Sequence, residues 1–233
     1  MRKLLGITAI AMIALAIPFA APAAAANGGS TTCTGMLHPG TYHRLVVPEN
    51  AVCIGQGPVK IVAGLWIQPG ATFVLGDEEH PGSNGSINGG VHATDPAGVQ
   101  IHFTTINGGL EIHGGSGPFG PPFDVTWNAI EDNWIHGGAT ITGYDGFWMG
   151  FIRNHVSGTV TLSNNTLVDP DGNEYVTNTI HGSMRCWDND RRRSSTQTKR
   201  SDAARCTTRP SGSVNLFSWS IGSGATTANI AGW

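Results

Sequence analysis

The chain has 233 residues, of which 33 are Gly and 13 are Pro, and only 12% of the residues are charged. These turn formers make up about a fifth of the chain, against about 12% in ordinary proteins, and argue against a helical bundle. With 39% hydrophobic residues and a formal net charge of −3 at pH 7, the chain is too apolar for a disordered protein. It also lacks the repeated long apolar runs of a multispanning membrane protein.

Residues 1–26 have the pattern of a secretory signal peptide. Arg2 and Lys3 supply the positive end, residues 4–20 the apolar stretch and residues 21–26 an alanine-rich cleavage region. An uncleaved N-terminal anchor is the alternative, because the apolar stretch approaches the length of a membrane-spanning helix. We therefore expect a secreted protein, extracellular or associated with the cell wall, that has no membrane contact after cleavage.

Four cysteines in an exported chain predict disulfides. Cys33 and Cys53 are 20 residues apart, and so are Cys186 and Cys206. Three pairings are formally possible, and a separation close to one structural repeat favours Cys33 with Cys53 and Cys186 with Cys206. The alternative is that one pair is reduced and buried.

A short phrase, in which a β-branched residue is followed by any residue and then Gly, recurs along the chain. Its copies begin at Ile87, Ile106, Ile135, Val156 and Ile180, at intervals of 19, 29, 21 and 24 residues. The longest interval contains the Gly- and Pro-rich run 114–122, and its removal leaves a unit of about 20 residues. Residues 62–67 form a sixth, degenerate copy.

Polar and apolar residues alternate after each Gly of the repeat, so one side of each copy belongs to the core. The predicted core positions are Val91, Leu110, Ala139, Val160 and Met184, followed by Ala93, Ile112, Ile141, Leu162 and Cys186. Asn133, Asn154 and Asn178 stand two residues before successive copies, with Thr104 in the corresponding place one copy earlier. We expect these asparagines to stack at a turn and to pair their amides from coil to coil.

These features predict an all-β solenoid of about six or seven coils over residues 27–186. The repeat resembles the single-stranded, right-handed parallel β-helix of the pectate-lyase-like superfamily over about residues 41–186. The chain also resembles small secreted actinobacterial β-helix proteins of poorly defined role. The right hand is implied by this resemblance alone. A β-sandwich is the alternative fold, because its short strands and turns can produce a similar pattern.

Residues 187–233 form a basic tail rich in Ser, Thr and Gly. Three basic residues stand against 13 acidic ones in residues 27–184, whereas eight stand against three in residues 185–209. We expect the tail to be partly flexible, with residues 214–221 as a candidate strand that caps the last coil. A frame change in the coding sequence near Cys186 would also explain the abrupt change in composition and charge at this point.

The outward columns of the repeat contain candidate catalytic residues. We expect His92 to lie opposite Glu111, with His113 and His136 nearby. A carboxylate beside an imidazole can serve as a general base, and several imidazoles can bind a divalent metal ion. The alternative is a polar, solvent-facing sheet with incidental histidines.

Other residues could serve a carbohydrate hydrolase or a sugar-binding surface. Carboxylates act in pairs in glycoside hydrolases, and the candidates here are Asp124, Glu131, Asp132 and Asp145. Arg153 lies beside the asparagine column, where a structural role is favoured. Sugar rings stack on aromatic faces, and the predicted substrate-binding residues are Trp148, Asn107 and Thr140.

An acidic turn offers oxygen ligands for calcium at Asp169, Asp171, Asn173 and Glu174, although Asp-Pro and Asp-Gly are also ordinary turn sequences. No other cofactor is expected.

Two functions remain. The first is a noncatalytic, monomeric module that binds a polysaccharide or a cell-envelope glycan, and the second is a small polysaccharide lyase or glycoside hydrolase that uses the His and Glu residues. We expect no nucleic-acid partner, since the sequence has no nucleotide-binding motif.

Overall fold

The computed structural model describes residues 28–55, 57–77, 79, 85–116, 127–169 and 172–191. The predicted signal peptide and the tail beyond residue 191 lie outside the described residues. The described residues form short strands and turns, without helices. Every strand pairing found among them is parallel. The protein is therefore all-β, and the pairing is unlike the antiparallel sheets of a β-sandwich.

Three long sheets and one short sheet contain all the described strands. Sheet I has the order β1 (Ser30–Thr32), β4 (Arg44–Val47), β7 (Leu65–Ile67), β10 (Val91–Thr94), β13 (Leu110–His113), β16 (Ala139–Thr142), β20 (Val160–Ser163) and β24 (Met184–Trp187). Sheet II has the order β2 (Met36–Leu37), β5 (Val52–Gly55), β8 (Thr72–Leu75), β11 (Gly98–His102), β14 (Trp127–Glu131), β18 (Trp148–Ile152) and β22 (Asn173–Glu174). Sheet III has the order β23 (Thr179–Ile180), β19 (His155–Val156), β15 (Trp134–His136), β12 (Thr105–Asn107), β9 (Gly85–Asn88), β6 (Val59–Ile61) and β3 (Gly40–Tyr42). Sheet IV contains β17 (Asp145–Gly146), β21 (Thr166–Leu167) and β25 (Asp190–Arg191).

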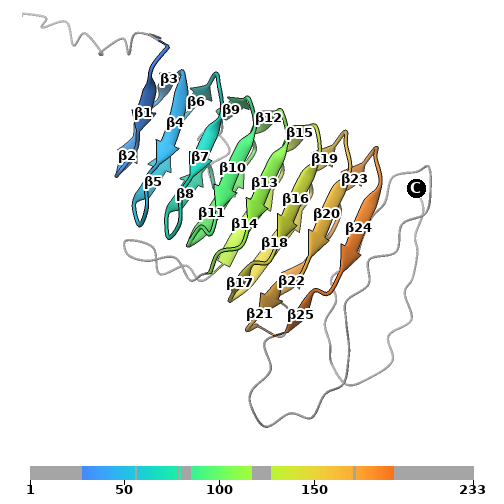
Figure 1. Ribbon diagram of the computed structural model, residues 1–233. Coiled ribbons are helices and arrows are strands. Elements are labelled where there is room, and N and C mark those ends of the chain that lie inside the picture. The colour runs from blue at the N-terminus through green and yellow to red at the C-terminus, as the bar shows by residue number, and fades with distance from the viewer. Residues whose placement is uncertain are drawn as a thin grey trace, which may run out of the picture.

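Successive strands of the chain enter sheets I, II and III in turn, and a strand of sheet IV follows sheet I from β16 onward. Figure 1 shows the strands stacked in sequence order along a rod, with the colour changing steadily from blue to orange. Each strand therefore pairs with the equivalent strand of the preceding and following repeat. This arrangement is compatible with a parallel β-helix.

Equivalent positions of the sequence repeat lie side by side on neighbouring strands of the structure. Val91, Leu110, Ala139, Val160 and Met184 are paired in register across sheet I. The core lies between the sheets, and these residues are buried in it together with the second predicted set, of which Cys186 is only partly buried. The predicted core of the repeat is thus confirmed.

The turn between sheets II and III contains a ladder of buried polar side chains, as the sequence predicts. The main-chain N–H of Thr104 donates to Oδ1 of Asn133 at 2.9 Å, that of Asn133 to Asn154 at 3.1 Å, and that of Asn154 to Asn178 at 2.9 Å. Each asparagine Nδ2 also donates to a main-chain carbonyl oxygen of the preceding repeat. These bonds satisfy backbone groups that the turn would otherwise leave unpaired.

The residue before each member of this ladder has a left-handed backbone. The φ values are 48° for Phe103, 56° for Asp132, 54° for Arg153 and 57° for Thr177. None of these residues is Gly, so each turn carries a conformational cost that the buried amide bonds offset. A second ladder, which the sequence analysis missed, joins Tyr144 N–H to Asn165 and Asn165 N–H to Asn189 at the turn after sheet I.

Glycines form the turn between sheets III and I because the chain of one repeat lies against the chain of the next. Gly108 and Gly137 have φ values of 110° and 141°. A Cβ atom at either position would lie 2.8 Å from a main-chain nitrogen of the preceding repeat, at Gly90 and Gly109 respectively. Larger residues would therefore push the repeats apart at this turn.

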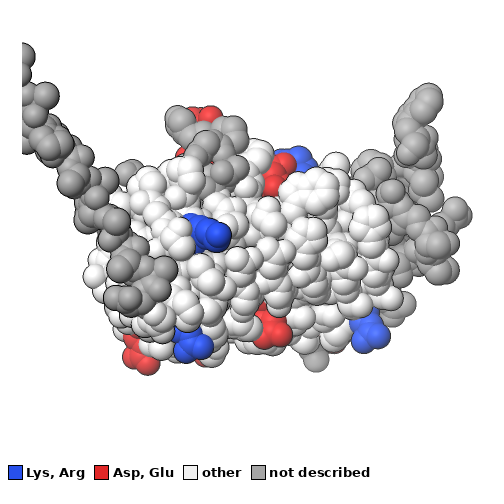
Figure 2. All heavy atoms as spheres, turned by 90° about the horizontal axis from the view of Figure 1, so that it is seen from above, with Lys and Arg blue, Asp and Glu red and all other residues white. Residues whose placement is uncertain are grey.

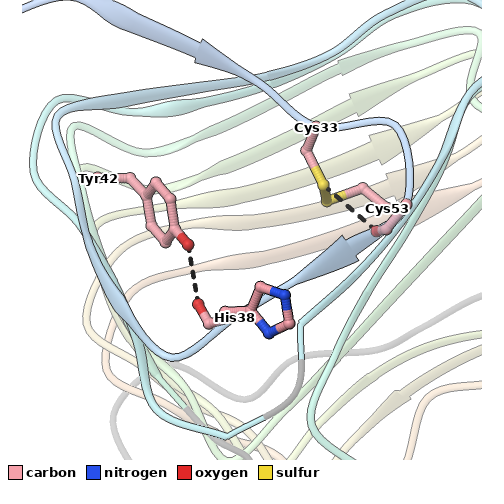
Figure 3. Close-up of a disulfide and its surroundings, with 5 residues drawn as sticks. Cys33, His38, Tyr42 and Cys53 are labelled. Carbon is pink, nitrogen blue, oxygen red and sulfur yellow. Dashed lines mark hydrogen bonds between the residues drawn. A yellow bond between two sulfur atoms is a disulfide. The ribbon is translucent and has the colours of Figure 1, made fainter. Parts of the chain in front are cut away.

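The predicted disulfide between Cys33 and Cys53 is present and joins two segments 20 residues apart in sequence. Figure 3 shows the disulfide and, separately, the hydrogen bond that the Tyr42 hydroxyl donates to the main-chain oxygen of His38 at 2.9 Å. The disulfide is consistent with an extracellular protein. Cys186 is also disulfide-bonded, and its predicted partner Cys206 lies outside the described residues.

Charged side chains are sparse on the face of the rod seen in Figure 2, where uncharged residues form most of the surface. Within the described part of the chain, no helix has the length and apolar character needed to span a lipid bilayer.

Candidate functional site

The outer face of sheet I contains the predicted pair of His92 and Glu111. The two residues are register partners on β10 and β13, and Nδ1 of His92 lies 3.4 Å from Oε2 of Glu111. Their side chains are 36% and 57% exposed. Nε2 of His92 lies 3.1 Å from the carbonyl oxygen of Gly89, so both ring nitrogens face hydrogen-bond acceptors. A general base needs a ring nitrogen that faces the proton of a substrate, and both nitrogens of His92 face acceptors of the protein itself.

The other predicted members of the catalytic patch are divided between two sheets. His113 is exposed on β13, in register with Thr94 and Thr142 of sheet I. His136 is exposed on β15 of sheet III, where its register partner is Asn107. The residues therefore do not form one patch on one sheet. The glycine turn between sheets III and I separates His136 from the others. His136 precedes the Gly pair of its repeat, whereas His92, Glu111 and His113 follow the Gly pairs of theirs.

Trp66 occupies the outer face of sheet I beside His92, its register partner. The two rings stack with centroids 5.2 Å apart and an angle of 25° between their planes. The guanidinium carbon of Arg44 lies 4.1 Å from the centroid of the Trp66 ring. The Trp66 ring is thus in contact with both a cation and an imidazole, which limits its use for a ligand.

Sheet III has a second outward aromatic group, which the sequence analysis did not single out. Trp134 is in register with Thr105 on one side and with His155 on the other. Its ring stacks on the His155 ring with centroids 4.2 Å apart and planes 6° apart. Trp134 is nevertheless 54% exposed, the largest value among the exposed large hydrophobic residues in the part of the chain that the structure describes.

Polar side chains lie beside Trp134 on the same face. Asn88, Asn107 and His136 occupy one register column of β9, β12 and β15. Asn107 Nδ2 donates to Asn88 Oδ1 at 2.7 Å, which leaves the other amide groups of this pair available for a ligand. Asn107 was predicted to bind substrate, and it lies two residues from Thr105 on the strand next to Trp134.

The alternation of the sequence accounts for this face. Ile87, Ile106, Ile135, Val156 and Ile180 are the buried residues of their strands. The residue on either side of each must then point outward. Trp134 directly precedes Ile135, so the rule that predicts an outward His136 also predicts an outward Trp134.

The other two predicted substrate-binding residues lie elsewhere. Trp148 is half-buried on β18 of sheet II, and its ring lies over Gly150, where it leaves no room for a side chain. Thr140 is half-buried on the outer face of sheet I, between Glu111 and Thr161 in register. The three residues are therefore not parts of a single site.

Charged residues gather where sheet II ends and the asparagine ladder begins. Arg153 donates from Nε to Oδ1 of Asp132 at 2.8 Å and from an η nitrogen to Oδ2 of the same residue at 2.8 Å. The same η nitrogen donates to Oε2 of Glu131 at 3.0 Å. Glu131 is 5% exposed, so the guanidinium neutralises a buried carboxylate.

This cluster also contains buried His102, and the ligand atoms of His102, Glu131 and Asp132 lie within 4.8 Å of one another. Such a set could bind a divalent metal ion, but the guanidinium of Arg153 already engages both carboxylates and would repel a cation. We interpret the cluster as a structural ion-pair group, in agreement with the role expected for Arg153. Of the other candidate hydrolase carboxylates, Asp145 lies on β17 of sheet IV and Asp124 lies outside the described residues.

The predicted calcium turn is described in part, since Asp171 lies outside the described residues. Asn173 Oδ1 accepts a hydrogen bond from the Tyr175 hydroxyl at 2.6 Å. Asp169 accepts through its main-chain oxygen from Gly172 N–H at 3.0 Å, as in an ordinary turn. Burial raises the pKa of the Tyr175 hydroxyl well above its usual range, so this residue remains a neutral donor to Asn173.

No protein-family model, curated protein or solved structure matches this chain.

Proposed function

We propose that this protein is a secreted, monomeric, right-handed parallel β-helix of about six or seven coils that binds a polysaccharide or cell-envelope glycan without catalysing a reaction. The observation that carries the proposal is the exposed ring of Trp134 on the outer face of sheet III. Because His155 stacks on one face of this ring, the opposite face is directed toward Thr105. A Thr side chain is much smaller than an indole, which leaves that face open to a ligand.

Carbohydrate is the ligand class that fits this surface best. The faces of a sugar ring carry C–H groups that pack on an aromatic ring, while its hydroxyl groups require hydrogen-bond partners. Trp134 supplies the aromatic face, and Thr105 and the Asn107 and Asn88 amides supply polar groups beside it. The His155 stack fixes the orientation of the indole before a ligand arrives, which reduces the entropy lost on binding.

A second candidate function is a polysaccharide lyase or hydrolase that uses the His92 and Glu111 pair. The 3.4 Å approach of these side chains is the observation that favours it. Against it stand the exposure of both groups and the acceptors that face both nitrogens of the His92 ring. An open sheet provides little of the water exclusion that strengthens catalytic electrostatics.

The test combines retention on insoluble glycans with an assay for reducing ends and unsaturated products, using residues 27–233 and matched variants. We expect the protein to be retained on at least one glycan without releasing product, and Trp134→Ala to lose retention. Trp66→Ala is the matched control, because its ring is covered by Arg44 and His92, and it should be retained normally. Product release that is lost in Glu111→Gln would establish the enzyme instead, and retention that survives in Trp134→Ala would refute the proposed site.

A further inference from the structure

We infer that the glycan is an uncharged linear chain that crosses the rod along the direction of β12, with one sugar ring on Trp134 and the next beside His136. This inference rests on the proposed function and specifies the ligand of the same site. It follows from the orientation of the Trp134 ring, from the residues that lie next along the strand and from the charges nearby.

The orientation of the ring sets the direction of the chain. Trp134 and His155 are neighbours across adjacent strands, and their rings are almost parallel, with planes 6° apart. Strands of the sheet are stacked along the rod, so the normal to the indole plane also points along the rod (Figure 1). A sugar stacked on the indole has its own plane across the rod. A linear chain that continues in that plane runs along the strands rather than from coil to coil.

The next group in that direction is His136. It lies two residues after Trp134 on β15, on the same outer face, at about 6.6 Å along the strand. This distance is comparable to the length of one sugar unit. The register partner of His136 is Asn107, so the Asn107 amide stands beside the same sugar unit of the glycan. A second sugar ring would therefore contact an imidazole and an amide.

The charge around the site favours a neutral glycan over a polyuronate. The outward residues of β9, β12 and β15 are Ser86, Asn88, Thr105, Asn107, Trp134 and His136, none of which carries a fixed charge. At the turn before Trp134, the guanidinium of Arg153 is already engaged by the carboxylates of Glu131 and Asp132. Lys60 on β6 is in register with Ser86 and stands two strands from β12, about 9.6 Å away. An acidic chain on β12 would therefore have no cation of the described residues in contact with its carboxylates, which favours a neutral chain.

The test is a calorimetric titration of the whole mature chain with monomers, dimers and tetramers of glucose, xylose, mannose and N-acetylglucosamine, and with galacturonate oligomers of the same lengths. We expect at least one neutral dimer to bind more tightly than its monomer by about three- to tenfold, the range given by one additional ring contact. His136→Ala should remove that gain and leave monomer binding unchanged. His181→Ala, which replaces an exposed histidine directly after β23, should retain the gain.

Two results would overturn the inference while leaving the proposed function standing. One is a dimer gain that survives in His136→Ala, and the other is binding of galacturonate oligomers as tight as that of the neutral ones, provided that Trp134→Ala still abolishes binding. Binding that is unaffected by Trp134→Ala would instead refute the proposed site and the inference together.

Discussion

Replacement of Asn154 by Ala should destabilise the protein far more than the loss of one polar side chain usually does. Asn154 is fully buried, and its Oδ1 accepts from the main-chain N–H and from Nδ2 of Asn133, both at 3.1 Å. Its Nδ2 donates to the carbonyl oxygen of Ile130 at 2.8 Å and to Oδ1 of Asn178 at 3.1 Å. All four bonds are lost in the variant, and the Asn133 N–H loses the side-chain acceptor it has in the ladder.

At about 1 kcal/mol for each hydrogen bond, the expected loss of unfolding free energy is about 4 kcal/mol. Asn107→Ala is the matched control, because this partly buried side chain makes one bond, to Asn88 at 2.7 Å, and should cost about 1 kcal/mol or less. Urea unfolding monitored by circular dichroism measures both values, provided that the dependence of the unfolding free energy on urea concentration is the same in both variants. Equal losses in the two variants would refute the claim that the ladder holds the repeats together.

Three further variants test other parts of the structure. Cys33→Ser removes a disulfide that closes a 20-residue separation with Cys53 and should lower the unfolding free energy by about 3 kcal/mol, with reduction of the wild type as a comparison. Arg153→Met leaves the buried Glu131 carboxylate without its guanidinium partner and should cost about 3 kcal/mol, much of which the double variant Arg153→Met, Glu131→Gln should recover; no recovery would contradict the ion-pair account. The raised pKa of Tyr175 means that, above about pH 10, the unfolded chain releases a proton that the native state retains, so stability should fall as pH rises there; Tyr175→Phe should reduce that fall in pH-dependent denaturation, and an unchanged fall would argue against it.

The sequence predicts the sheets well because each repeat contains the same recognisable sequence features. The β-branched residue at the start, the Gly pair at the turn and the alternation after it assign each residue to the inside or the outside. Alignment of the repeats therefore predicts that Val91 pairs with Leu110, and the pairing in sheet I confirms this register. A shift by one residue would place this whole apolar set in water, so the register has no close competitor.

The asparagine ladder was predictable for the same reason, since Asn133, Asn154 and Asn178 keep a constant offset from the repeat. The second ladder has only two asparagines, Asn165 and Asn189, at a position where the earlier repeats have other residues. Two occurrences do not establish a column, so the pattern alone could not identify it.

The candidate site was predicted in part. Asn107 was selected because it lies in an outward column, and the structure places it beside the exposed indole. Trp148 was selected instead of Trp134 because alternation within a dense aromatic run points it outward, yet its ring lies over Gly150. Ring stacking depends on side-chain rotamers across neighbouring strands, and the spacing of residues along the chain contains no information on them.

The most direct test of carbohydrate binding at sheet III is an NMR titration of the tryptophan indole N–H signals with the glycan that retains the protein, using soluble oligomers. The Trp134 signal is assigned as the one missing from the Trp134→Phe variant. We predict that this signal shifts in a saturable way while the Trp66 signal does not move. A titration in which Trp66 shifts and Trp134 stays fixed would place the ligand on sheet I and contradict the account.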